Sequence, residues 1–166
     1  VLGRYFSTSF GDKLYDFSLK HELIPSSKEI LKAKINSKYP QSWIKVVVSY
    51  IHEKNKNFND LHEYSGTVVT VIPSRPSTQE PMKRMEIMLD DVKEFYEKTN
   101  NNNDIDQTIF LPKLIKFDDE TLQNKGLTAH ERMVNIRDHL RIVDNSKIKN
   151  KCVIVIDDVV TSGASL

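Results

Sequence analysis

The sequence predicts an α/β fold in which a parallel sheet is flanked by helices and preceded by a helical N-terminal extension. Two uncharged runs rich in β-branched residues, 67–72 and 153–156, are typical of strands buried on both faces, as in a parallel sheet. Between them, residues 80–98 repeat apolar side chains at helical spacing. Another apolar run begins at Ile109. We therefore expect 67–117 to form a β-α-β crossover with parallel strands.

The composition narrows the class of protein. The 166 residues suit one domain with an extension, and the net charge of +1 lacks the basic excess of most nucleic-acid-binding proteins. No apolar segment approaches the roughly 20 residues that a membrane helix needs, and no signal-peptide pattern opens the chain. The single cysteine, Cys152, excludes an internal disulfide and a cysteine-cluster zinc site. We expect a cytoplasmic protein in which Cys152 is a buried small side chain, not a nucleophile.

Residues 1–65 are expected to form the helical extension. Asp12 is a suitable N-cap for a short helix. Ser26, with Glu29 three residues later, is a capping box that starts a second helix. Gly66 marks the change to alternating strands and helices, so the core is expected to span 66–166.

The segment 42–53 fits two templates. Its apolar residues recur at helical spacing, whereas the triplet Val46-Val47-Val48 has high strand propensity. We prefer the helix. The polar residues that follow, 54–64, are expected to form a loop.

Ile109-Phe110-Leu111 is expected to start a second strand, which either ends before Pro112 or continues past it to Phe117. Proline has no N–H to donate to a strand ladder, so such a strand would be bent or would lie at the sheet edge. The polar residues 118–127 predict a loop after it.

A second capping box, Thr128 with Glu131, predicts a helix that ends near His139. The side chains expected on its inward side are Met133, Ile136 and Leu140. A short strand at 140–143 and a turn at 144–150 then lead to the last strand, 153–157.

The end of that last strand carries the candidate chemistry. Two acids, Asp157 and Asp158, are followed by a loop of small and hydroxyl residues, Thr161 to Ser165. The acids would also fit a solvated strand end or a Walker B motif. The Walker B interpretation needs a phosphate-binding G-x-x-x-x-G-K-[ST] loop, which none of the five glycines begins. The loop itself favours phosphate binding, because backbone N–H groups and hydroxyls can encircle an anion and Gly163 allows close approach.

Residues 153–165 resemble the phosphoribosyl pyrophosphate signature of type I phosphoribosyltransferases. That signature has four apolar residues, two acids, two apolar residues and a Thr-Thr-Gly-Ala-Thr-like loop, which here reads Thr161-Ser162-Gly163-Ala164-Ser165. Upstream, Val71-Ile72-Pro73-Ser74-Arg75 looks like a strand end of the ComF-like and amidophosphoribosyltransferase-like branch. Later residues that look like that branch are Gly126, Leu127, Glu131, Arg132 and Asn135. The resemblance covers 66–166, although the cysteines of the ComF zinc ribbon are missing.

This resemblance implies a Rossmann-like phosphoribosyltransferase core and a set of ligand contacts. Asp157 and Asp158 would bind the ribose hydroxyls of phosphoribosyl pyrophosphate, and residues 161–165 would bind its 5′-phosphate. Ser74 and Arg75 would contact the pyrophosphate, although a surface role for Arg75 is an equal alternative. The substrate's own oxygens would supply most of the Mg²⁺ ligands, with Asp157 and Asp158 as further candidate ligands.

The resemblance also implies a reaction, in which a nitrogen nucleophile displaces pyrophosphate from C1 of the ribose. Arg75 and Arg132 are the candidate catalytic residues, and Arg137 is a weaker candidate. Two alternatives stay open. In the first, the chain is a non-catalytic sensor of phosphoribosyl pyrophosphate or nucleotides. In the second, it is an accessory domain that binds a protein partner or a second copy of the chain through its N-terminal extension. The helix that should back the phosphate loop would begin near Ser165, so we expect the core to be truncated at its C-terminal end.

Overall fold

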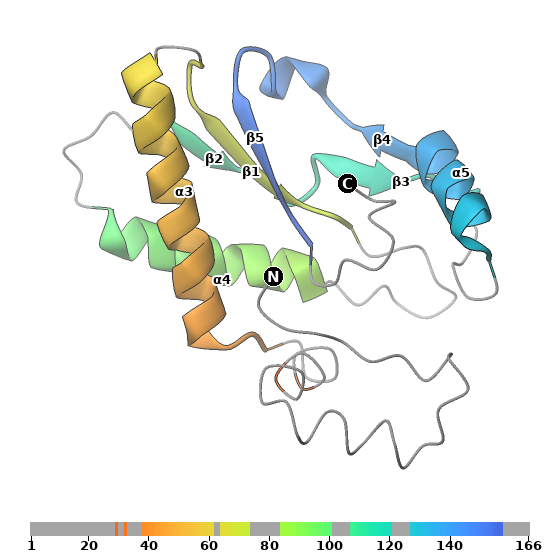
Figure 1. Ribbon diagram of the computed structural model, residues 1–166, viewed down its shortest axis with the longest axis horizontal. Helices are drawn as coiled ribbons and strands as arrows, with labels where there is room; N and C mark the ends of the chain where they lie inside the picture. The colour runs from red at the N-terminus through yellow and green to blue at the C-terminus, as the bar shows by residue number, and fades with distance from the viewer. Residues whose placement is uncertain are drawn as a thin grey trace.

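The computed structural model describes residues 38–61, 64–73, 84–100, 107–120 and 127–157, together with Glu29 and Lys32, which are helical. Figure 1 shows the elements in these ranges. In chain order they are α3 (Gln41–Leu61), β1 (Thr67–Val71), α4 (Arg84–Thr99), β2 (Thr108–Phe110), β3 (Ile115–Phe117), α5 (Ala129–His139), β4 (Leu140–Ile142), the 3₁₀ turn η2 (Asn145–Lys147) and β5 (Cys152–Ile156). The first two predicted helices, apart from Glu29 and Lys32, lie outside these ranges.

The main sheet has three strands in the order β2-β1-β5, and both strand pairs are parallel. Val69 pairs with Phe110 on β2 and with Ile154 on β5. The chain reaches β2 from β1 through α4, which confirms the predicted β-α-β crossover and its parallel strands. The fold is therefore α/β with a parallel sheet.

Helices α3 and α4 cover one face of this sheet, where they form the larger hydrophobic core (Figure 1). Val69 and Val71 of β1 point into that core, together with Ile154 and Ile156 of β5. The buried side chains that the two helices contribute are Ile44, Val48, Ile51, Met85, Met88, Leu89, Val92 and Tyr96. Within the described ranges, no helix is long and apolar enough to cross a membrane.

The predicted burial of both strand faces is correct for β1 and wrong for β5. All five residues of β1 are buried. On β5, however, Val153 and Val155 are 38% and 37% exposed, respectively. The difference arises because β1 is the central strand, whereas β5 lies at an edge of the described sheet and packs on the helices through alternate residues.

Helix α3 confirms the preference for a helix at 42–53, but it continues to Leu61. The loop predicted from residue 54 is therefore wrong up to that position. The apolar stripe of Ile44, Val48 and Ile51 continues at helical spacing to Asn55, which is only 8% exposed. Because the buried amide is hydrogen-bonded, the polar composition of this turn does not end the helix.

The predicted second strand is present as β2, but its continuation past Pro112 to Phe117 is wrong. Strand β2 ends at Phe110, a turn follows with a hydrogen bond from Leu114 N to Leu111 O at 3.3 Å, and β3 begins at Ile115. Pro112 lies within this turn, where its missing N–H costs no ladder bond.

Strand β3 pairs antiparallel with β4 in a second, two-stranded sheet. Leu114 and Ile115 pack with Val68 and Ile72, which point away from the α3–α4 core. The second sheet therefore lies over the other face of β1.

Helix α5 begins with the predicted capping box. The backbone N–H of Glu131 donates to Thr128 Oγ1 at 3.3 Å, and the Thr128 N–H donates to Glu131 Oε2 at 2.7 Å. Ile136 is buried as predicted, but Met133 is 57% exposed. The buried side of α5 carries Asn135 and Ile136. Because successive residues of a helix are rotated by about 100°, Met133 lies to one side of these two residues.

Candidate functional site

The carboxyl ends of β1 and β5 meet at one edge of the main sheet. Val71 is the register partner of Ile156, and the Ile72 N–H donates to the Ile156 carbonyl at 3.0 Å. This bond extends the pairing beyond the end of β1. Pro73 and Asp157, the next residue of each strand, therefore lie at the same edge.

Two of the predicted ligand-binding segments begin at this edge. Ser74 and Arg75 follow Pro73 directly, and Asp158 follows Asp157. These residues and the predicted phosphate loop, 161–165, lie outside the described residues. Asp157 is thus the member of the predicted ribose and phosphate sites that the structure describes.

Asp157 is half-buried at the end of its strand. A carboxylate there can accept hydrogen bonds from vicinal hydroxyls, and its oxygens are of the type that Mg²⁺ prefers. One or two carboxylates suffice when a substrate phosphate supplies the other oxygens, so Asp157 fits this mode of Mg²⁺ binding. Within the described ranges, no three His, Cys, Asp or Glu side chains are grouped to hold a metal ion.

Arg132 lies in the first half of α5, and its side chain is half-buried. Its Nε donates to the Leu127 carbonyl at 3.0 Å, while its backbone N–H donates to the Thr128 carbonyl. The first of these bonds holds the guanidinium against the start of the helix. Arg132 thus belongs to the helix that leads directly into β4, and the hydrogen bonds that position it are made to residues at the start of that helix.

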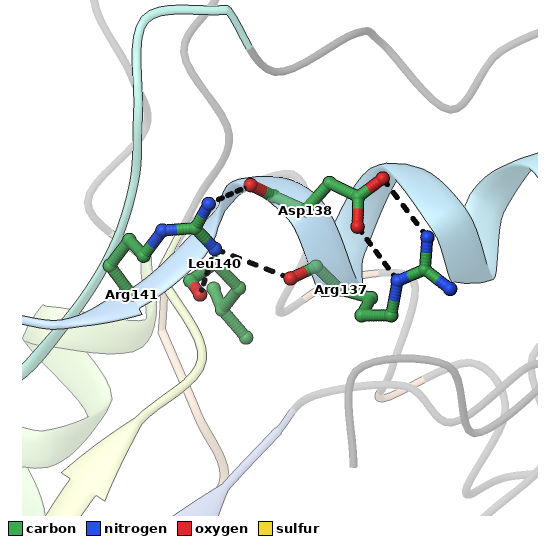
Figure 2. Close-up of polar contacts among 4 residues, drawn as sticks. All are labelled: Arg137, Asp138, Leu140 and Arg141. Carbon is green, nitrogen blue, oxygen red and sulfur yellow. Dashed lines mark hydrogen bonds and ion pairs between the residues drawn. The ribbon is translucent and has the colours of Figure 1, made fainter.

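Arg137 is exposed and paired with its neighbour. Its Nε and Nη2 donate to the two carboxylate oxygens of Asp138 at 2.7 and 3.2 Å (Figure 2). This pairing raises the pKa of Arg137 and lowers that of Asp138. Because the Asp138 carboxylate binds both Nε and Nη2, Arg137 fits a surface ion pair better than a substrate contact.

Cys152 begins β5, where it is partly buried. Burial raises the pKa of its thiol, and the nearby charge of Lys54 opposes that effect only in part. A thiol with a raised pKa forms little of the thiolate that attacks electrophiles. These observations agree with the expected structural role at a strand start.

A polar cluster that the sequence did not reveal lies at the opposite, N-terminal edge of the sheet. Asn55 Nδ2 donates to Thr108 Oγ1 at 2.8 Å and to the Tyr96 hydroxyl at 3.1 Å. Its Oδ1 accepts from the Thr67 hydroxyl at 2.6 Å. The ring of His52 stacks on Tyr96 with centroids 4.6 Å apart. This network joins α3, α4, β1 and β2, so its role is to fix their arrangement.

Comparison with protein-family models, curated proteins and solved structures finds no match to this chain. The fold class therefore rests on the sheet topology alone. The candidate site rests on the position of Asp157 and on the residues that follow it in sequence.

Proposed function

We propose that this protein binds phosphoribosyl pyrophosphate with Mg²⁺ and catalyses displacement of pyrophosphate from C1 of the ribose by a nitrogen nucleophile. The observation that carries this proposal is the position of Asp157. It ends a parallel strand next to the end of β1, and Asp158 with the 161–165 loop follows it in sequence.

The strand order supports a ligand site at this edge. From β1 the chain crosses to β2 on one side, while β5 lies on the other. In open α/β sheets, ligands bind outside the carboxyl ends of the strands at the point where the strand order reverses. The ends of β1 and β5, with Pro73 and Asp157, form such a point.

Each proposed contact has a matching chemistry. Asp157 and Asp158 would accept hydrogen bonds from the ribose hydroxyls, and the backbone N–H groups of 161–165 would donate to the 5′-phosphate. Arg75 would pair with the leaving pyrophosphate through its planar guanidinium. Because the carboxylates and the phosphate-binding loop are separate, the carboxylates would not repel the bound 5′-phosphate.

Catalysis would depend on positioning and electrostatics, with no covalent nucleophile. The sugar gains positive charge and the leaving group gains negative charge as the bond to pyrophosphate breaks. Arg75 would stabilise the leaving group, and the two carboxylates would hold the ribose in place. Bound Mg²⁺ would supply further positive charge to the pyrophosphate oxygens.

The binding step can be tested by calorimetry with phosphoribosyl pyrophosphate and Mg²⁺. The double variant Asp157→Asn/Asp158→Asn removes both charges at nearly constant volume, and we expect a loss of at least about tenfold in affinity. Asp90→Asn is the matched control, because Asp90 is an exposed acid on α4. Unchanged binding by the double variant would show that the site is misassigned.

The chemical step is tested by pyrophosphate release over a panel of nucleobases, glutamine and ammonia. Release with any acceptor, and its loss in the double variant, would support a transferase. Tight binding without release across the panel would instead indicate a non-catalytic sensor.

A further inference from the structure

The outer face of the two-stranded sheet carries two cations directly opposite each other. Lys116 on β3 is the register partner of Arg141 on β4, and both side chains are exposed. Like charges at such a position destabilise a strand pair, because directly opposed Cβ atoms are only about 4.5–5.5 Å apart. A local conflict of this kind is expected where a residue serves a function.

Arg141 is held in place by backbone carbonyls, and its charge is also near enough to contribute to the lowered pKa of the Asp138 carboxyl. Its Nη1 donates to the carbonyls of Arg137 at 3.2 Å and Leu140 at 3.1 Å, and its Nη2 donates to the Asp138 carbonyl (Figure 2). These carbonyls belong to the end of α5 and the residue after it. The contacts use three of the five guanidinium donors, so the group is oriented while two donors remain for another acceptor.

Two of the nearby carboxylates already have side-chain partners. Asp138 is bound by Arg137, and the Asp118 carboxylate contacts Nδ1 of His139 at 2.8 Å. Asp119 and Glu120 are exposed in the turn after β3 and have no ion pair among the described residues. Their charge would oppose an anion on this face, which makes Asp119 useful in a test.

We propose that Lys116 and Arg141 form a binding site for the diphosphate group of a small molecule. The pair offers an ammonium, which acts as a point charge, and an oriented guanidinium, whose fork matches phosphate oxygens. An anion bound by both side chains would offset the repulsion between their charges. This site goes beyond the proposed function, because neither residue belongs to the ribose-phosphate site.

The experiment is a titration with inorganic pyrophosphate, followed by NMR of the backbone amides. We expect shifts at 115–117 and 140–142. We expect the double variant Lys116→Gln/Arg141→Gln to bind about tenfold or more weakly. Lys116→Gln alone should lose several-fold in affinity, and it leaves the Arg141 contacts at the end of α5 intact, which separates weak binding from misfolding.

Two control variants complete the design. Lys149→Gln removes an exposed charge outside this sheet and should bind like the parent. Asp119→Asn removes a repelling charge and should bind about twofold more tightly. Shifts confined to other amides, or affinity of the double variant within twofold of the parent, would overturn this site without bearing on the site at Asp157.

Discussion

Asn55 connects helix α3 to three other elements through one buried amide, so its removal should have a large effect on stability. Asn55→Ala deletes hydrogen bonds to Tyr96, Thr108 and Thr67. The first two partners remain bonded to each other at 3.1 Å, but Thr67, which is 3% exposed, loses the acceptor of its hydroxyl.

The magnitude follows from these contacts. The bonds to Tyr96 and Thr108 contribute about 1 kcal/mol each, and the buried Thr67 hydroxyl that loses its acceptor costs about 1–3 kcal/mol. The better helix propensity of alanine offsets roughly 0.5 kcal/mol. We therefore expect Asn55→Ala to lower the free energy of unfolding by about 3 kcal/mol.

Urea denaturation followed by circular dichroism measures this difference. Asn57→Ala is a matched control, since Asn57 has the same side chain, lies two residues further along α3 and is exposed. That variant should be neutral or slightly stabilised. If the two variants differ by less than about 0.5 kcal/mol, the network does not stabilise the fold as described.

Two further predictions concern the capping box and the sheet. Hydrogen bonds from Thr128 lower the pKa of Glu131, so its contribution to stability is present above the pKa of the unfolded chain and is lost as the pH falls through the lower folded value. The free energy of unfolding of Glu131→Gln should therefore vary less between about pH 2.5 and 6 than that of the parent, and parallel pH profiles would contradict this. Val71 is fully buried and Val155 is 37% exposed. Val71→Ala should therefore lower the free energy of unfolding by about 2 kcal/mol, and Val155→Ala by less than about 1 kcal/mol. Equal decreases in urea denaturation would argue against the one-sided packing of β5.

The features that depend on nearby residues could be predicted from the sequence. The capping box at Thr128 needs only a side chain three positions away, and it is present as expected. The runs at 67–72 and 153–156, with the amphipathic helix after the first, were sufficient to predict a parallel sheet with a crossover.

Two of the failures depend on contacts between distant residues. The sequence predicts Asn55 as a loop residue, because its partners Thr67, Tyr96 and Thr108 are far away in the chain. The sequence of an uncharged strand such as β5 does not indicate which of its faces is exposed to solvent, because the exposure depends on the position of the strand in the sheet. For the candidate site, the sequence predicted Asp157 at a strand end, while its position beside Pro73 follows from the strand register.

The strand order has a consequence for folding. Helix α3, β1, α4 and β2 are consecutive in the chain, and Thr70 and Leu111, which join β1 to the turn after β2, are 41 positions apart. Strand β5 instead meets β1 across a much longer separation, since the Ser65 hydroxyl bonds the Asn150 carbonyl 85 positions away. Contacts at such separation form late, because loop closure must be achieved before the contacts are made. The edge with Asp157 is therefore completed only when β5 docks. Any ligand that binds there will favour the docked state and stabilise the whole sheet, by an amount that grows with the logarithm of the ligand concentration above its Kd.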